Sequence, residues 1–357
     1  MRKVRIAFIG VSNTHVANNA EAFAKCFEMC EIVGAADYPV HNPEDIETKK
    51  QLNFPKNIEI KVWEDYKELL KQNIDLAIIC AEVGDYASAC EEVLSMDIHA
   101  LVEKPMALNM EHAVRMYNAH KKSKAQLMIN WPVAWFPTFR KLKELADSGE
   151  VGDILRVQYR SPATFGPYSS KVEDRSELAD QWWYKKEKGG GAILDYACYG
   201  CVLTTWLASK KAESVYGIKK NFLIPFAEVE DYSAFTLDFG NCVGFLEGSW
   251  STVSNGEIPT GPVVYGSKGV IVADRFDTKV KVYKTFLPYK PSPAPDAVYD
   301  VSEMEDNLAL NVINFILKGT PLFEMITADF NIKAMAALDA GIRSCESGKS
   351  EEVKNYE

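Results

Sequence analysis

The sequence predicts a two-domain α/β protein, with a doubly wound parallel sheet at the N-terminus and a C-terminal α/β domain built on a large open, mostly antiparallel β-sheet. In the first third of the chain, short apolar runs alternate with helix-length segments, which is typical of parallel strands joined by helical crossovers. After Ala212, β-rich runs follow one another without helices between them, as in an open antiparallel or mixed sheet. A length of 357 residues suits two domains better than one.

The first domain is predicted over residues 1–125 as a Rossmann fold. Its first strand is a nearly continuous apolar run closed by Gly10, which indicates a central strand covered on both faces. The expected strands are Val4–Ile9, Glu31–Ala36, Ile58–Val62, Asp75–Ala81, His99–Glu103 and, just beyond the boundary, Gln126–Asn130. The expected helices are Val16–Cys26, Glu64–Lys71, Asp85–Ser95 and Met110–Lys122.

The second domain is predicted over residues 126–357 and is expected to bind the substrate. It should open with a helix over Pro137–Ser148 and a long alternating strand over Gly152–Ser161. The later strands are expected at Ser214–Leu223, Asp231–Phe239, Cys242–Thr252, Pro262–Tyr265, Val270–Ala273 and Lys279–Tyr283. Two helices, Met304–Leu317 and Thr327–Ser347, close the chain, and the last can pack back on the first domain. The acidic tail Glu351–Glu357 is expected to be a solvated end.

Composition excludes several classes of protein. A net charge of −10 and a pI near 5.2 argue against a nucleic-acid binder, because duplex binding depends on lysine and arginine neutralising phosphates. No segment approaches the roughly 18 apolar residues of a membrane span, and the N-terminal apolar run is too short for a signal peptide. We therefore expect a cytoplasmic protein whose eight cysteines are reduced, buried thiols. The sequence has no cluster with metal-ligand spacing, so no metal is expected.

The loop after the first strand keeps one glycine of the dinucleotide-binding pattern G-x-G-x-x-G. Gly10 is retained, whereas Ser12 takes the second glycine position and His15 the third. The serine hydroxyl and the following backbone amides can still bind phosphate oxygens at a helix N-terminus. Asp37, which lies 27 residues after Gly10, is close to where such folds place the acid that binds the adenosine ribose. For the loop alone, a strand–turn–helix without a ligand remains an alternative.

The residue at the end of the second strand also bears on the choice of cofactor. Asp37 would repel a 2′-phosphate, and Tyr38-Pro39-Val40 offers no arginine to pair with one. NAD is therefore the preferred cofactor, with NADP as the other possibility.

Lys104 is the first candidate for chemistry. It stands in Glu103-Lys104-Pro105, directly after the strand His99–Glu103, and the proline pins the chain behind it. The carboxyl ends of parallel strands are where ligands collect in an open sheet. We expect Lys104 to face a nicotinamide ring there.

A second motif combines Gly189-Gly190-Gly191 with a helix that carries Asp195 and Tyr199. Three glycines let the backbone approach a ligand closely, and positions i and i+4 lie on one helix face. None of the five histidines lies in the second domain, so Tyr199 or Lys104 is expected to move the proton, with Asp195 as the orienting group. The alternative is that Asp195 caps the helix or forms an ion pair, and that Tyr199 is packing.

Taken together, these motifs resemble the glucose-fructose oxidoreductase/inositol dehydrogenase (Gfo/Idh/MocA) family over nearly the whole chain. The resemblance implies NAD(P)-dependent oxidation or reduction of a sugar, inositol or related polyol. It also implies Lys104 as the catalytic lysine, Asp195 as its helper at the substrate, and Tyr199 in the place usually held by histidine. The expected cofactor-binding residues are Gly10, Ser12, Asn13, Thr14, His15, Asp37, Ala81, Glu103 and Lys104. The expected substrate-binding residues are Asn130, Trp135, Trp183 and Lys185, although such tryptophans are more often packing.

Two other functions are compatible with the same fold. One is an NAD-dependent glycosidase that uses bound NAD transiently, and the other is a non-catalytic sensor or regulator that binds a dinucleotide. The tyrosine at position 199 and the incomplete glycine loop both fit the sensor. The sensor would report through a partner protein. For the enzymatic functions the expected small-molecule partner is a carbohydrate or polyol substrate, and the fold likeness suggests a homodimer or homotetramer formed through the C-terminal sheet.

Overall fold

The computed structural model of the protein describes residues 2–13, 15–39, 54–55, 57–162, 166–167, 172–252, 260–284, 294–302, 304 and 306–356. Residue contacts divide the chain into two units. Unit 1 holds Met1–Trp131 and Asp306–Ile332, and unit 2 holds Pro132–Glu305 and Lys333–Glu357. Compared with the expected boundary at residue 125, unit 1 also takes in one more strand and a helix from the C-terminal part of the chain.

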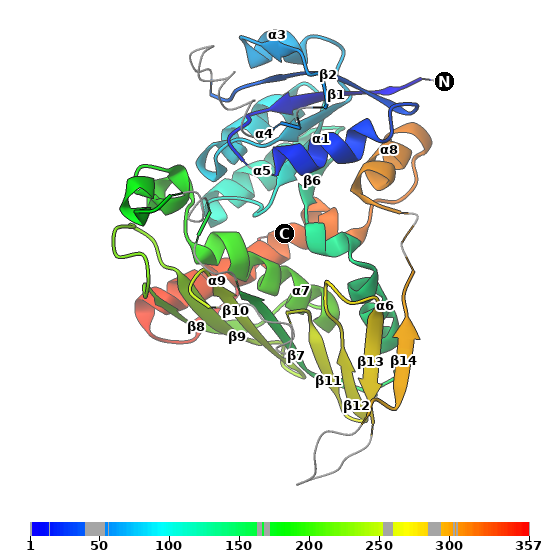
Figure 1. The fold of residues 1–357 in the computed structure, drawn as a ribbon, viewed down its shortest axis with the longest axis vertical. Coiled ribbons are helices and arrows are strands. Elements are labelled where there is room, and N and C mark those ends of the chain that lie inside the picture. Colours follow the sequence, from blue (N-terminus) through cyan, green and yellow to red (C-terminus); the bar gives the residue numbers. More distant parts are fainter. Residues whose placement is uncertain are drawn as a thin grey trace. The chain divides into compact units, whose positions relative to one another are not determined.

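Unit 1 is built on a six-stranded parallel sheet with the order β3-β2-β1-β4-β5-β6, which confirms the Rossmann fold (Figure 1). Its strands are β1 (Val4–Ile9), β2 (Cys30–Ala36), β3 (Val62–Trp63), β4 (Leu76–Ile79), β5 (His99–Glu103) and β6 (Leu127–Asn130). The side chains of β4 are all buried, and β1 and β5 are nearly so, as expected of central parallel strands covered on both faces.

The strand expected at Ile58–Val62 is wrong, because β3 begins only at Val62. The Ile58 N–H donates to the Pro55 carbonyl at 3.1 Å, so these residues form a turn before the strand. Ile60 is buried with 3% exposure. Pairing with β2 reaches only Lys61 and Val62 at the end of the expected range, where the Ala35 N–H donates to the Lys61 carbonyl at 2.9 Å, so the apolar alternation before them marks burial of side chains.

Of the described helices of unit 1, three begin at a residue whose side chain caps the first turn, and two have no side-chain cap. They are α1 (Val16–Ala24), α3 (Tyr66–Leu70), α4 (Tyr86–Ser95), α5 (Met110–Lys122) and α8 (Leu308–Lys318). Asn307 accepts a hydrogen bond from the Leu310 N–H at 3.1 Å, which explains why α8 begins at Leu308 and not at the expected Met304. Figure 1 shows α8 beside α1, and α8 also contacts β1.

Unit 2 is built on a nine-stranded sheet with the order β14-β13-β12-β11-β7-β10-β9-β8-β15. All pairs are antiparallel except β7 with β10, so the predicted mostly antiparallel sheet is confirmed. Its strands are β7 (Ile154–Pro162), β8 (Ser214–Lys220), β9 (Tyr232–Asp238), β10 (Val243–Ser249), β11 (Val263–Gly266), β12 (Gly269–Val272), β13 (Lys279–Tyr283), β14 (Ala297–Asp300) and β15 (Glu351–Glu352).

The expectation of a solvated acidic tail is wrong for its first residues. Glu351 pairs with Val215 as part of β15, and its carboxylate accepts a hydrogen bond from Arg343 at 2.6 Å. Val353 follows and is buried with 4% exposure. One apolar residue and one arginine are enough to hold this segment against the sheet edge. Neither β14 nor β15 was expected from the sequence.

Helices cover one face of the unit 2 sheet. They are α6 (Pro137–Asp147), α7 (Cys198–Ala208) and the second part of α9 (Ala328–Ser347). The packing is close, because a Cβ on Gly200 of α7 would lie 2.6 Å from Leu246 of β10. On the other face, Tyr216, Ile218 and Phe245 are 47%, 43% and 40% exposed.

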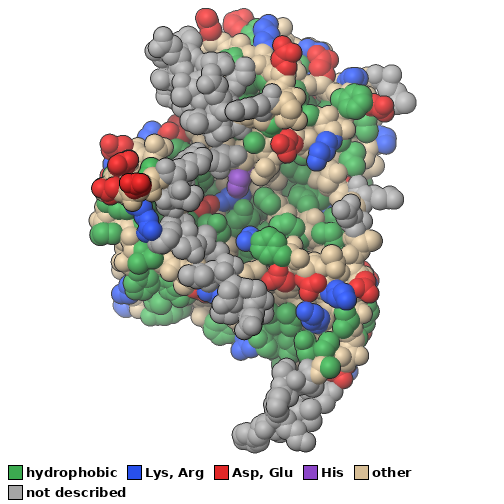
Figure 2. Space-filling model, in the orientation of Figure 1, with side chains coloured by type: hydrophobic (Ala, Val, Ile, Leu, Met, Phe, Trp, Pro, Cys, Tyr) green, Lys and Arg blue, Asp and Glu red, His purple; other side chains and the backbone are tan. Residues whose placement is uncertain are grey.

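The described residues show the following surface charges, helix lengths and groups of potential metal ligands. Acidic and basic side chains are interspersed over the face shown in Figure 2. Within the part of the chain that the structure describes, no helix combines the length and apolarity of a bilayer span. The same residues contain no group of three His, Cys, Asp or Glu side chains that could hold a metal ion. None of the eight cysteines, all of which the structure describes, forms a disulfide bond.

Candidate active site

The first cluster lies at the carboxyl edge of the unit 1 sheet and begins with Gly10, directly after β1. Gly10 has φ +77°, and a Cβ there would lie 2.5 Å from the backbone of Ala81. Only glycine therefore lets the loop after β1 approach the chain that follows β4. The Asn13 N–H strengthens this approach by donating to the Cys80 carbonyl at 3.0 Å. The structure thus brings together Gly10, Asn13 and Ala81, three of the predicted cofactor-binding residues.

The loop leads directly into the N-terminus of α1. The Asn13 side chain accepts the His15 N–H at 2.9 Å, a local turn that sets the start of the helix. His15 is the N-cap residue, it makes no side-chain cap to the first turn, and that turn carries no acidic residue. Such a helix end favours an anion. Ser12 and Asn13 are buried beside it, and Thr14, another predicted cofactor residue, lies outside the described residues.

Asp37 directly follows β2 and is buried with 1% exposure. The next residue, Tyr38, donates its hydroxyl to Glu92 of α4 at 3.1 Å, and Tyr66 donates to the same carboxylate at 2.6 Å. Burial first, and then the Glu92 charge, raise the pKa of both tyrosines, so both stay protonated donors. Glu92 was not among the predicted site residues, and it adds a second carboxylate near this end of the sheet.

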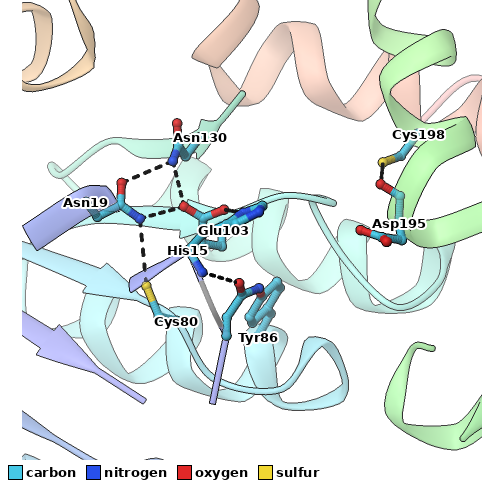
Figure 3. Close-up of polar contacts among 9 residues, drawn as sticks. His15, Asn19, Cys80, Tyr86, Glu103, Asn130, Asp195 and Cys198 are labelled. Atoms are coloured by element: carbon cyan, nitrogen blue, oxygen red, sulfur yellow. Dashed lines mark hydrogen bonds and ion pairs between the residues drawn. The ribbon is translucent and has the colours of Figure 1, made fainter. Parts of the chain in front are cut away.

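Glu103 is the centre of a buried polar network at the end of β5, drawn in Figure 3. One carboxylate oxygen accepts hydrogen bonds from the side-chain amides of Asn19 at 2.5 Å and Asn130 at 2.6 Å. The other oxygen lies 3.0 Å from Nδ1 of His15. Burial raises the pKa of Glu103, but the charge of His15 and the three hydrogen bonds outweigh it, so the pKa is lowered overall. The network therefore holds an ionised carboxylate with 0% exposure.

This network changes the environment expected for two predicted site residues. Asn130, predicted to bind substrate, uses its amide group on Glu103 and Asn19. Lys104 follows Glu103 and is buried with 2% exposure. Burial first, and then the charge of Glu103, raise the pKa of the Tyr86 hydroxyl. The positive charge of Lys104 lowers that pKa, but by less, so the pKa is raised overall. Asn19 and Tyr86 were not predicted as site residues.

The second cluster belongs to unit 2 and begins with the triglycine turn. Gly189 and Gly191 have φ of +86° and +105°, which favours glycine at both positions. Gly190 has no such φ, but a Cβ there would lie 2.1 Å from the Trp183 carbonyl oxygen. The Glu230 carboxylate accepts a hydrogen bond from the Ile193 N–H, just after the turn, at 3.0 Å. The pKa of Glu230 is raised, mainly because the side chain is buried.

Asp195 follows the turn, but the helix around it differs from the expected one. Residues Ile193–Ala197 form a π-helix, so the regular α-helical spacing assumed for Asp195 and Tyr199 is wrong. The Asp195 carboxylate accepts a hydrogen bond from Nε1 of the buried Trp250 at 2.9 Å. Tyr199 lies in the first turn of α7, with its ring centroid 6.3 Å from that of Tyr196. Short π-helical turns of this kind occur frequently at functional sites.

The predicted substrate-binding residues of unit 2 occupy three different environments. Trp183 is buried and stacks on Trp182 with ring centroids 3.7 Å apart. Its Nε1 has no hydrogen-bond partner among the described residues. Lys185 forms ion pairs with Glu228 at 3.2 Å and Asp180 at 3.7 Å. The guanidinium of Arg140 covers the ring of Trp135 at 4.8 Å.

The fold and these two clusters define a two-domain oxidoreductase of the dinucleotide-binding class. Residues 4–131 match the family described as "Oxidoreductase family, NAD-binding Rossmann fold", and residues 139–272 match "GFO/IDH/MocA C-terminal domain". The chain belongs to the Gfo/Idh/MocA oxidoreductase family.

Similar proteins include dehydrogenases of sugars and inositol. The chain is 28% identical over 201 residues to D-xylose 1-dehydrogenase [NADP(+)] of Haloarcula marismortui, a match that covers 56% of this chain and 51% of that protein. It is 28% identical over 221 residues to myo-inositol 2-dehydrogenase of Thermotoga maritima, covering 60% of this chain and 61% of the relative. The chain thus spans between half and two thirds of the length of these relatives.

A solved structure extends the likeness to the whole fold. The WlbA dehydrogenase of Bordetella pertussis, in complex with NADH and UDP-GlcNAcA, has a TM-score of 0.75 and 21% identity. The alignment covers 99% of this chain and 100% of that one. At this identity the likeness shows the shared fold alone.

Proposed function

We propose that this protein is an NAD(P)-dependent dehydrogenase or reductase that transfers a hydride between nicotinamide and a CH–OH carbon of a sugar, inositol or related polyol. The observation that carries the proposal is the burial of Lys104, with 2% exposure, directly after the ionised Glu103 at the carboxyl edge of a Rossmann sheet. Lysine is seldom buried to this degree unless it is paired. The names of the xylose and inositol dehydrogenases support the substrate class.

The residues at this edge fit a dinucleotide. The close approach of Gly10 to Ala81 shapes the loop after β1, and the N-terminus of α1 has no acidic residue in its first turn. Asp37, at the end of β2, suits two ribose hydroxyls better than a 2′-phosphate. A bound nicotinamide would supply the hydride acceptor or donor at its C4 atom. We propose NAD as the preferred cofactor, although one relative is named for NADP(+).

Two side chains are candidates for the group that moves the proton. In the oxidative direction, Lys104 or Tyr199 would accept the proton of the substrate hydroxyl. Asp195, whose carboxylate is fixed by Trp250, would orient the substrate. If Lys104 is the acceptor, its neutral amine takes the proton and becomes an ammonium, which stabilises the negative charge that develops on the substrate oxygen.

The test is a screen of sugars, inositols and polyols with NAD and NADP, read at the absorbance of the reduced nicotinamide. Lys104→Ala should abolish turnover while NADH binding stays measurable, and the exposed Lys25→Ala serves as the matched control. Near-wild-type turnover by Lys104→Ala would refute the assignment. Release of the leaving group from an aryl glycoside without net NADH would favour the glycosidase. NADH binding without turnover of any polyol would favour the sensor.

We also propose that the protein forms a homodimer or homotetramer through the uncovered face of the unit 2 sheet. A shallow depression on this face is lined by aromatic and aliphatic side chains, including those of Tyr216, Ile218 and Phe245. The ion pair of Arg160 with Glu247, at 2.8 Å, lies among them. Exposed apolar side chains gathered on one sheet face, with a charged pair among them, are typical of an interface between subunits.

A further inference from the structure

The ring nitrogens of His15 have different roles in the Glu103 network. Nδ1 lies 3.0 Å from a carboxylate oxygen of Glu103, and that carboxylate is also held by Asn19 and Asn130 (Figure 3). An ionised carboxylate can only accept hydrogen bonds, so the proton in this contact resides on Nδ1 of His15. The contact therefore fixes both the orientation of the ring and the position of one proton.

The other ring nitrogen, Nε2, makes no hydrogen bond to the described residues. The His15 side chain is 28% exposed, whereas Glu103 has no exposed surface, so the ring reaches from a buried carboxylate towards solvent. Within the described part of the chain, the His15 ring forms its hydrogen bond through Nδ1. The ring thus has one edge held by the protein and one polar atom able to contact a ligand.

His15 is also the N-cap residue of α1, whose first turn has neither an acidic side chain nor a side-chain cap from His15. It stands where the dinucleotide pattern has its third glycine, so a side chain replaces bare backbone at this point. Resting on the proposed dinucleotide function, we propose that His15 is a diphosphate-binding residue positioned by Glu103. Its Nε2–H donates to a phosphate oxygen of the cofactor.

The charges that surround the ring support this role. Glu103 faces Nδ1, the neighbouring Asn19 and Asn130 are neutral, and a diphosphate would add a second anion at Nε2. Nδ1–H donates to the Glu103 carboxylate, and a proton on Nε2 would donate to a phosphate oxygen. A hydrogen bond to an anionic phosphate is stronger than one between neutral groups. The His15 side chain therefore compensates for the incomplete glycine loop.

Binding of cofactor fragments tests the proposal. NADH, ADP-ribose, ADP and AMP are titrated by calorimetry against the wild type and against His15→Gln, His15→Lys and, as a matched control, His112→Gln in α5. We expect His15→Gln to weaken NADH, ADP-ribose and ADP by roughly 30-fold, with a smaller loss for AMP, which lacks the second phosphate. His15→Lys should recover most of the loss because it restores a donor to the phosphate, and His112→Gln should bind like the wild type.

Two spectroscopic measurements separate this role from a merely structural one. The ³¹P resonances of bound NAD should differ between the wild type and His15→Gln and should keep their wild-type positions in His112→Gln. In Glu103→Gln, the introduced amide would donate to Nδ1 of His15 and move the ring proton to Nε2. Histidine ¹⁵N spectra should therefore show Nδ1 protonated in the wild type and unprotonated in this variant. An unchanged ring in Glu103→Gln would contradict the positioning role of Glu103.

The outcomes also separate this inference from the proposed function. If the wild type binds neither NADH nor ADP-ribose, both fail together. If the wild type binds NADH and turns over a polyol, but His15→Gln binds ADP and NADH equally well, only the role of His15 is overturned. A loss confined to ADP-ribose and NADH, with ADP unaffected, would place the contact on the second ribose and would likewise overturn the diphosphate assignment.

Discussion

The carboxylate of Glu103 lies 3.0 Å from Nδ1 of His15, although the two residues are 88 positions apart in the sequence. This contact joins the last residue of β5 to the first residue before α1. The segment that carries Lys104 and the loop expected to bind the cofactor are therefore fixed to one buried charge. A disturbance of Glu103 should be felt both in stability and in cofactor binding.

Replacing Glu103 should destabilise the protein in a pH-dependent way. Glu103→Ala removes the acceptor of the Asn19 and Asn130 amides and the partner of His15, and we expect a loss of about 3 kcal/mol in the free energy of unfolding at pH 7. The folded state lowers the Glu103 pKa, so the stabilisation is fully present above the unfolded value of 4.5 and is lost as the pH falls through the folded value. Urea unfolding of the wild type and Glu103→Ala at pH 7 and at progressively lower pH measures this effect. A difference between the two proteins that stays constant below pH 4.5 would contradict it.

Adding a single methyl group at Gly190 of the triglycine turn should lower the stability of the protein more than adding one at Gly149, where the space is open. In Gly190→Ala the new Cβ would overlap the Trp183 carbonyl oxygen at 2.1 Å, and backbone cannot move aside cheaply. We expect a loss of more than about 2 kcal/mol in stability. Gly149→Ala is the control, because it has φ +76° with nothing within 4 Å and should cost only about 1 kcal/mol of backbone strain. Thermal unfolding compares the two, and equal losses would show that the turn tolerates a side chain.

The sequence predicted most of the framework, because apolar periodicity reports burial directly. The bounds of β5, α5 and β13 are those expected, and the strands of the parallel sheet were found by their apolar runs. The strand β15 was missed because two glutamates give no apolar signal, and its pairing depends on Arg343 from the preceding helix.

The site was predictable only in part. Glu103, Lys104 and Asp195 stand in short local motifs, so the sequence alone pointed to them. The partners Asn19 and Tyr86 come from distant segments, and nothing local distinguishes them from ordinary helix residues. The π-helical turn at Asp195 depends on close packing against β10, where a Cβ on Gly248 would lie 2.4 Å from the Ala197 nitrogen. Packing of this kind between separate elements has no signature in a linear pattern.

A charge on the uncovered face of the unit 2 sheet should dissociate the proposed oligomer. Phe245 is 40% exposed, and Arg156 lies 5.9 Å from its ring, so Phe245→Arg adds a like charge where an apolar surface is expected to be buried. Light scattering should show the wild type as a dimer or tetramer and Phe245→Arg as a folded monomer. Phe276→Arg, at a residue that is 77% exposed in the turn between β12 and β13, should assemble like the wild type. A monomeric wild type would contradict the assembly.

The hydrogen bond between Trp250 and Asp195 should affect turnover more than it affects folding. Trp250→Phe removes the Nε1 donor that holds the Asp195 carboxylate at 2.9 Å, so the carboxylate can rotate away from the orientation assumed for catalysis. We expect kcat to fall about tenfold with little change in cofactor affinity. Trp131→Phe is the matched control, since it removes a similar buried hydrogen bond, from Nε1 to Asn331 at 2.6 Å, and should cost stability without this effect on kcat. In the Asp195→Asn background, Trp250→Phe should have little further effect, because the carboxylate that it orients is already gone. Additive losses in the double variant would show that Trp250 acts on turnover by a route other than Asp195.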